Sequence, residues 1–175
     1  MVTKNLYCIV GASGTGKTTL ANAIEKDLGL KQVQSYTTRP PRHENEEGHT
    51  FISNEEFKGL KDLVAYTKFD GYEYGVTRDM LEDCSLYVVD VEGVKTLKRL
   101  YKERPIVVIG LSDKEHVRAL RMFSRGDSVE KVRDRIVNDR IMFADFDKVF
   151  DAVFAGLNMA EIICLAIEKI KIEER

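Results

Sequence analysis

Short apolar runs alternate along this chain with longer segments whose apolar residues recur at helical spacing. A short apolar run bounded by polar residues is typical of a buried strand, and helical spacing is typical of an amphipathic helix. Strands and helices in alternation indicate an α/β fold, in which helices cover both faces of a parallel sheet. We expect about five strands, at residues 6–10, 31–34, 86–90, 105–109 and 152–154.

Helical segments separate most of these runs. The first helix should end at Gly29 and the last should begin at Asn158. Residues 112–115 (Ser-x-x-Glu) and 127–130 (Asp-x-x-Glu) fit N-terminal capping patterns, and the second of these helices should run to about residue 143. The inner faces expected for the first helix, the helix after Asp90 and the last helix are Leu20, Ala21, Ile24 and Leu28; Val94, Leu97, Leu100 and Tyr101; and Met159, Ile162, Ile163, Ala166, Ile167 and Ile170.

Residues 36–83 interrupt this alternation. They are polar, and they contain a Pro-Pro step and an acidic run over residues 44–47. Residues 50–53 alternate as a short strand does, and residues 55–63 have helical character. We therefore expect a small lobe inserted into the α/β core. The ranges left for that core are 1–35 and 84–175.

Composition narrows the class of protein. The chain has 175 residues, 43% hydrophobic and 32% charged, as in a soluble single domain. A net charge of −2 does not favour a nucleic-acid partner. No apolar stretch reaches the length of a membrane span, and no basic stretch leads into one, so we expect a cytoplasmic protein without a membrane anchor. Cys8 and Cys164 lie in apolar segments and are expected to be buried, and the three histidines show no metal-ligand spacing.

Residues 11–18, Gly-Ala-Ser-Gly-Thr-Gly-Lys-Thr, fit the phosphate-binding loop pattern at every fixed position. The loop stands between a predicted strand and a predicted helix, which is the context the motif requires. Its glycines allow several backbone N–H groups to point at phosphate oxygens, and the helix adds its positive end. Lys17 should reach the β- and γ-phosphates, and the Thr18 hydroxyl should hold Mg²⁺.

Two further features suit the same chemistry. Asp90 closes a predicted strand at its carboxyl end, where ligands gather in open α/β sheets, so it could orient Mg²⁺ or its waters. Arg39 and Arg42 flank the Pro-Pro step. Two guanidinium groups on a stiff loop are suited to binding a second phosphate dianion.

The segment from Ser35 to Arg42 matches the pattern S-x-T-T-R-x-x-R fully, and with it the chain resembles the guanylate kinase family. The resemblance covers nearly the whole chain. It continues through Phe51, Glu56, Phe57, Gly71, Tyr74, Gly75, Asp90, Glu92, Arg121, Arg125, Gly126 and Arg135.

This resemblance implies a P-loop kinase fold and ATP-dependent phosphorylation of a nucleoside monophosphate, with GMP the expected acceptor and Mg²⁺ the cofactor. The expected partners are then small-molecule nucleotides, with no nucleic acid and no membrane, and the sequence does not give the oligomeric state. A lid over about residues 121–135 would clamp the transferring phosphoryl group. The implied catalytic residues are Lys17, Arg39, Arg121, Arg125 and Arg135; the ATP site is Gly11, Ala12, Ser13, Gly14, Thr15, Gly16, Lys17, Thr18 and Thr19; the GMP site is Ser35, Arg39, Arg42, Tyr74, Thr77 and Glu92; and the metal site is Thr18 and Asp90.

The chain departs from the family pattern mainly where the base would be recognised. Ala65 replaces a glutamate, His49 or Thr50 replaces a tyrosine, and Val76 replaces a serine or threonine. A late asparagine near adenine aligns with Gly156. Two alternatives therefore stay open: a kinase for another phosphorylated acceptor such as ribose 1,5-bisphosphate, or a non-catalytic binding module. Arg42 and Glu92 argue against the first, and the intact phosphate loop argues against the second.

Overall fold

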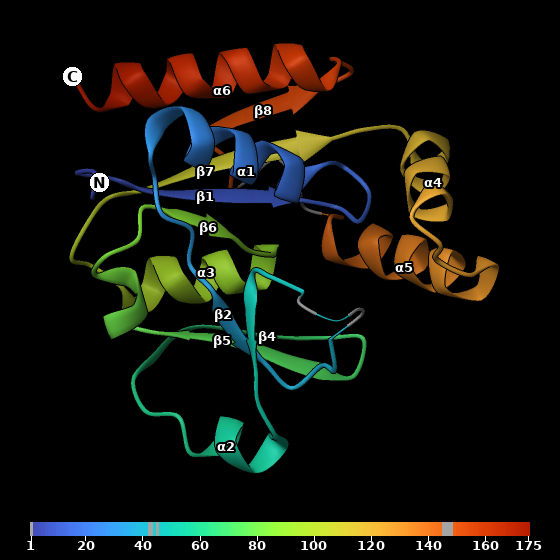
Figure 1. Ribbon diagram of the computed structural model, residues 1–175, viewed down its shortest axis with the longest axis horizontal. Helices are drawn as coiled ribbons and strands as arrows, with labels where there is room; N and C mark the ends of the chain where they lie inside the picture. The colour runs from blue at the N-terminus through green and yellow to red at the C-terminus, as the bar shows by residue number, and fades with distance from the viewer. Residues whose placement is uncertain (1, 42–43, 45, 145–148) are drawn as a thin grey trace.

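A parallel four-stranded sheet forms the centre of the molecule (Figure 1). The computed structural model describes residues 2–41, 44, 46–144 and 149–175. The two central strands of this sheet are buried on both faces, as their apolar runs predict. In spatial order the strands are β6 (Leu86–Val88), β1 (Leu6–Gly11), β7 (Ile106–Ser112) and β8 (Ala152–Ala155).

The strand expected at residues 31–34 is reduced to a single parallel bridge between Gln32 and Leu86. The Gln32 side chain turns back to the first helix, where its Nε2 donates to Glu25 Oε2 at 2.6 Å. Three residues later Ser35 already pairs with a strand of the lobe. The segment thus crosses from one sheet to the other, which leaves the main sheet with four strands among the described residues instead of the expected five.

Helices cover the two faces of the main sheet. On one face α1 (Lys17–Leu28) and α6 (Met159–Glu173) pack side by side, and their buried residues include Leu20, Ile24 and Ile162 (Figure 1). On the other face α3 (Val91–Leu100) lies between the main sheet and the sheet of the lobe. The α/β class predicted from the alternation is therefore confirmed.

The lobe has a small mixed sheet of its own, in the order β3-β2-β5-β4. The helix expected over residues 55–63 is much shorter, because Gly59 caps it and Asp62 has a positive φ of 55°. Ser53 and Glu56 close its first turn as a capping box. The elements are β2 (Ser35–Thr37), β3 (His49–Phe51), α2 (Asn54–Lys58), β4 (Leu63–Phe69), β5 (Tyr72–Thr77) and the 3₁₀ turn η1 (Asp79–Leu81).

Two helices, α4 (Glu115–Ser124) and α5 (Val129–Met142), form the segment expected to be the lid. The capping pattern at 112–115 is not used, because Ser112 belongs to β7 and Lys114 precedes the helix without a side-chain cap. At α5 the cap is Ser128, one residue later than expected, and its hydroxyl accepts from Lys131 N. The cap expected for α6 at Asn158 is confirmed.

Two burial assignments, those of Leu100 and Cys164, differ from expectation. Leu100 is 40% exposed because it is the last residue of α3, whereas Val94 and Leu97 of the same helix are buried. Cys164 is exposed on α6, whereas Cys84 is buried beside η1, and the three cysteines are free thiols. No helix in the described part of the chain is long and apolar enough to cross a membrane.

Candidate active site

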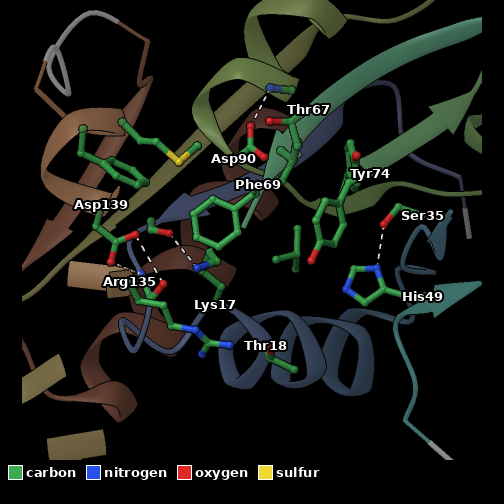
Figure 2. Close-up of a pocket in the computed structure, with 18 of the residues that line it drawn as sticks. Lys17, Thr18, Ser35, His49, Thr67, Phe69, Tyr74, Asp90, Arg135 and Asp139 are labelled. Atoms are coloured by element: carbon green, nitrogen blue, oxygen red, sulfur yellow. Dashed lines mark hydrogen bonds between the residues drawn. The ribbon is translucent and has the colours of Figure 1, made fainter. Parts of the chain in front are cut away.

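One cavity of about 240 Å³ opens where the carboxyl ends of β1 and β6 meet the lobe and the lid (Figure 2). It brings together residues that are far apart in sequence, and its two ends differ in character. The phosphate loop and the lid line one end, with Gly11, Ser13, Gly14, Lys17, Thr18, Arg125, Arg135, Asp139, Met142 and Phe143. The lobe and the end of β6 line the other, with Ser35, His49, Tyr66, Thr67, Phe69, Tyr74, Tyr87, Val88, Val89, Asp90 and Gly93.

The phosphate loop curls as its glycines allow. Gly14 and Gly16 have positive φ of 79° and 97°, a conformation that side chains disfavour. The Thr15 hydroxyl closes the loop by donating to the Ala12 carbonyl at 2.8 Å. Of the nine residues expected to bind ATP, five line the cavity, while Ala12, Thr15, Gly16 and Thr19 do not.

Lys17 lies inside the loop and donates from Nζ to two loop carbonyls, Gly11 O at 2.7 Å and Ala12 O at 3.1 Å (Figure 2). Burial lowers the pKa of Lys17 to about 8, although the nearby Asp139 carboxylate acts in the opposite direction. The ammonium group is therefore short of negative partners, and an anionic phosphate would favour its charged form.

Binding of ATP should consequently take up a proton at alkaline pH. In the free protein the pKa of Lys17 is about 8, and phosphates beside Nζ raise it, so at about pH 9 the group is largely neutral before binding and charged after it. Calorimetric titrations in buffers of different ionisation enthalpy measure this uptake directly. A binding enthalpy at about pH 9 that is the same in every buffer would contradict the prediction.

Of the residues expected to bind the acceptor phosphate, Arg39 follows β2 and Tyr74 lies on β5. Arg39 is buried and its guanidinium donates to Glu46 through Nη1 at 3.1 Å and Nη2 at 2.8 Å. The same group stacks over Phe51 at 5.4 Å from the ring centre and does not line the cavity. Tyr74 does line it, whereas Arg42 lies outside the described residues.

Ser35 and His49 stand together at the lobe end of the cavity. Ser35 Oγ and His49 Nδ1 are 2.9 Å apart, and the His49 ring meets the Tyr74 ring edge to face with centroids 5.7 Å apart (Figure 2). Of the two residues aligned with the family's tyrosine, His49 lines the cavity and Thr50 does not. Ala65 and Val76 are fully buried in the hydrophobic core behind the cavity.

Two of the three lid arginines line the cavity. Arg135 is 6% exposed and its Nη1 donates to Asp127 Oδ2 at 3.2 Å, while its buried Nε has no hydrogen-bond partner among the described residues. Arg125 shares the same carboxylate at 2.6 Å but is more exposed. Arg121 is turned to the outside of the phosphate loop, where it contacts the Gly14 carbonyl at 3.1 Å and Asp113 at 2.9 Å.

Asp90 is the carboxylate at the lobe end of the cavity, next to Thr67 (Figure 2). It caps α3, with Oδ1 accepting from Gly93 N at 2.7 Å. Burial raises the pKa of Asp90, and hydrogen bonds from Gly93 and Thr67 act against that rise. Glu92, the expected base reader, is instead exposed and paired with Lys95 at 2.6 Å, away from the lining residues.

The family model for guanylate kinase matches residues 3–171 of this chain. This chain belongs to the guanylate kinase family. Three members show the range of similarity. The guanylate kinase of Fusobacterium nucleatum is 28% identical, over 91% of both chains; that of Polaromonas sp. strain JS666 is 30% identical, over 77% of this chain and 71% of its own; and that of Neisseria gonorrhoeae is 32% identical, over 78% and 72%.

Solved structures agree on the fold. A guanylate kinase from Anaplasma phagocytophilum superposes with a TM-score of 0.70 over 99% of this chain and 88% of its own, at 22% identity. A sugar kinase from Janibacter sp. HTCC2649 reaches a TM-score of 0.55 at 13% identity, over 97% and 95%. The fold expected from the resemblance is thus confirmed.

Within this guanylate kinase family member, sequence reasoning missed several residues of the site. Thr67 and Phe69 reach the cavity from β4, and Asp139 reaches it from α5. Asp139 stands four residues after Arg135, so the two share one helix face, and that spacing was the available signal. Arg118 does not line the cavity, but it is buried and donates to Asp139 Oδ2 at 2.6 Å.

Proposed function

We propose that this protein transfers the γ-phosphoryl group of ATP to GMP and releases ADP and GDP. One observation carries the proposal: a single cavity is lined at one end by the phosphate-loop residues Lys17 and Thr18 and at the other by the lobe. Two phosphorylated ligands could therefore meet inside one cavity. The family supports the same conclusion, because its curated members are named guanylate kinases.

Phosphoryl transfer needs the two substrates in line and their negative charge compensated, with little covalent help from the protein. The loop amides and Lys17 supply positive charge beside the donor phosphates, and Arg135 supplies it from the lid. Arg135 is buried, so its interaction with phosphate is weakly screened by water. Tyr74 and Ser35 would orient the acceptor from the lobe.

The donor set fits a magnesium ion held mainly by nucleotide. The described residues contain no group of three or more His, Cys, Asp or Glu side chains able to hold a metal by themselves. Mg²⁺ is commonly bound by one or two protein oxygens together with substrate phosphates and water. The Thr18 hydroxyl at the first turn of α1 is such an oxygen, and the ion would neutralise developing charge on the phosphates.

Asp90 fits the acceptor base better than the metal. Its carboxylate already accepts from Gly93 N, and its place beside Thr67 is at the lobe end, where the acceptor would lie. Guanine presents an N1–H and an exocyclic amine on one edge, which match the two oxygens of a carboxylate. We therefore propose Asp90 as the base reader, in place of Glu92.

The substrate assignment is tested by measuring ADP release with GMP, dGMP, AMP, UMP and ribose 1,5-bisphosphate as acceptors. We expect the highest kcat/KM for GMP. If the protein phosphorylated another acceptor but not GMP, the assignment of GMP as substrate would be wrong and only the assignment as a phosphotransferase would stand. ATP binding without turnover of any acceptor would favour the binding module. The cytoplasm is the compartment we propose, in keeping with the three free thiols.

Asp90→Asn should lower kcat/KM for GMP by about tenfold to a hundredfold and change that for AMP much less. Asparagine keeps the helix cap, because it serves at N-cap positions as well as aspartate, but it offers one acceptor oxygen where guanine needs two. Glu92→Gln, two residues away and exposed, is the matched control and should leave the GMP preference intact. The reverse pattern, with loss only in Glu92→Gln, would return the base-reading role to Glu92.

A further inference from the structure

A buried ion pair joins both lid helices to the phosphate loop. Arg118 of α4 donates from Nη1 to Asp139 Oδ2 of α5 at 2.6 Å. The same Nη1 donates to the Ser13 carbonyl at 3.1 Å, and the Asp139 carboxylate accepts from Ser13 N at 2.9 Å. Arg118 and Asp139 are 5% and 4% exposed. The pair thus occupies both backbone polar groups of one loop residue.

The phosphate loop also packs directly on the backbone of α4. A side chain added at Gly14 would place its first carbon 2.6 Å from the Arg118 carbonyl oxygen, closer than any real contact. Position 14 therefore needs glycine for this approach as well as for its positive φ of 79°. The phosphate loop and α4 are therefore in direct backbone contact at Gly14, next to the hydrogen bonds at Ser13.

Stability alone does not account for a buried pair of this kind. Removing two charges from water costs several kcal/mol per ion, and well-packed apolar side chains often stabilise a fold as well as the pair does. What apolar side chains cannot do is hydrogen-bond the Ser13 amide and carbonyl. The distinctive contribution of Arg118 and Asp139 is therefore their hydrogen bonding to the backbone of Ser13.

We propose that Arg118 and Asp139 are positioning residues that latch the lid to the phosphate loop and so hold the lid arginines over the cavity before the substrates bind. The inference rests on the proposed kinase function. Asp139 lies one turn after Arg135 on α5, and Arg118 of α4 lies two turns before Arg125, the residue that directly follows this helix. Because Asp139 and Arg118 are held against Ser13, Arg135 and Arg125 are held over the position of the donor phosphates.

The latch also limits how the loop can bind phosphate. Ser13 N already donates to Asp139, so it is not free to bind a phosphate oxygen while the latch is closed. Thr15 N also donates within the loop, to the Ala12 carbonyl at 3.3 Å, so the amides of Gly14, Gly16, Lys17 and Thr18 are left to hold the donor. Ser13, which the motif assigns to ATP, therefore serves the lid in this protein.

The test replaces both partners at once, as Arg118→Met with Asp139→Leu, which leaves no unpaired charge in the interior. We expect this double variant to fold with little change in Tm, while kcat falls by about tenfold to a hundredfold and KM for GMP changes by less than about twofold. Hydrogen exchange of the Ser13 amide, followed by NMR in the ligand-free protein, should accelerate by about tenfold or more.

A matched control is available between the same two helices. Glu115 and Arg140 form an exposed bidentate pair at 2.7 Å that joins α4 to α5 without touching the loop. Glu115→Gln should change neither kcat nor Ser13 exchange. If it lowers kcat as much as the double variant does, the effect belongs to the helix pair in general and the proposal is wrong.

Arg118→Lys is the second variant, used if the double variant does not fold, because it keeps a cation beside Asp139 and leaves no unpaired charge in the interior. Lysine lacks the guanidinium fork that joins Asp139 to the Ser13 carbonyl, so kcat should still fall by about tenfold. Unchanged Ser13 exchange together with unchanged kcat in a folded variant would overturn the latch. If the wild type proves not to phosphorylate GMP, Ser13 exchange in the ligand-free protein still decides whether the latch exists.

Discussion

Lys17→Ala should lower kcat by about a hundredfold to a thousandfold while the protein stays folded. Lys17 is the one ammonium group of the loop that lines the cavity, and phosphoryl transfer depends on positive charge placed where negative charge is redistributed. Its Nζ contacts only loop carbonyls among the residues that the structure describes, so its removal breaks two hydrogen bonds and no ion pair. Folding should be little affected, because the burial of this cation is itself unfavourable.

Turnover with ATP and GMP, circular dichroism and thermal unfolding are the measurements. Lys26→Ala serves as the control, because Lys26 lies on the same helix, in its last turn, and points to solvent. It should retain wild-type kcat. A Lys17→Ala enzyme that turns over within about threefold of wild type would remove this residue from the mechanism, since even one lost transition-state contact typically costs more.

Features encoded by neighbouring residues could be predicted from the sequence. The phosphate loop needs a run of eight residues between a strand and a helix, and that run lies between β1 and α1. The strands at residues 6–10, 86–90, 105–109 and 152–154 each correspond to a strand of the main sheet. For β1 and β7 the signal is local, because burial on both faces makes the whole segment apolar. The edge strand β8 is only partly buried, and its signal is a short apolar run.

Side-chain direction near a helix start was harder to predict. Asp90 and Glu92 are two residues apart and both acidic, so their order in the sequence does not separate their roles. The helix begins between them: Asp90 is its cap and faces the cavity, and Glu92 is in the first turn and faces solvent. Residues two apart on a helix do not share a face. The choice of Glu92 as base reader missed this boundary.

Long-range pairing was beyond the sequence pattern. Arg118 and Asp139 are 21 residues apart on different helices, and nothing in the periodicity of either helix marks them as partners. Arg121 shows the converse case. Its spacing from Arg125 suits one helix face, but the approach of α4 to Gly14 turns it to the outside of the loop. Only the docking of the lid decides which arginines reach the cavity.

Arg135→Lys should reduce kcat by about a hundredfold to a thousandfold and leave KM for GMP nearly unchanged. Arg135 is buried at the cavity, and one of its donors, Nε, has no partner within the described residues. A buried donor left unpaired is costly, so the group is suited to an oxygen that arrives with the substrate. An arginine that reaches the transferring phosphoryl group contributes about 10³–10⁵ in kcat in related phosphotransferases.

Lysine tests geometry instead of charge. It preserves the cation and can still pair with Asp127, but it has neither the planar fork nor the Nε donor of arginine. Arg133→Lys, the same change on the same helix at an exposed residue paired with Asp134, is the control and should retain wild-type kinetics. Initial rates over a matrix of ATP and GMP concentrations separate kcat from KM. If Arg135→Lys raised KM for ATP or GMP and left kcat intact, Arg135 would act in ground-state binding, because a contact made only in the transition state lowers kcat and kcat/KM together.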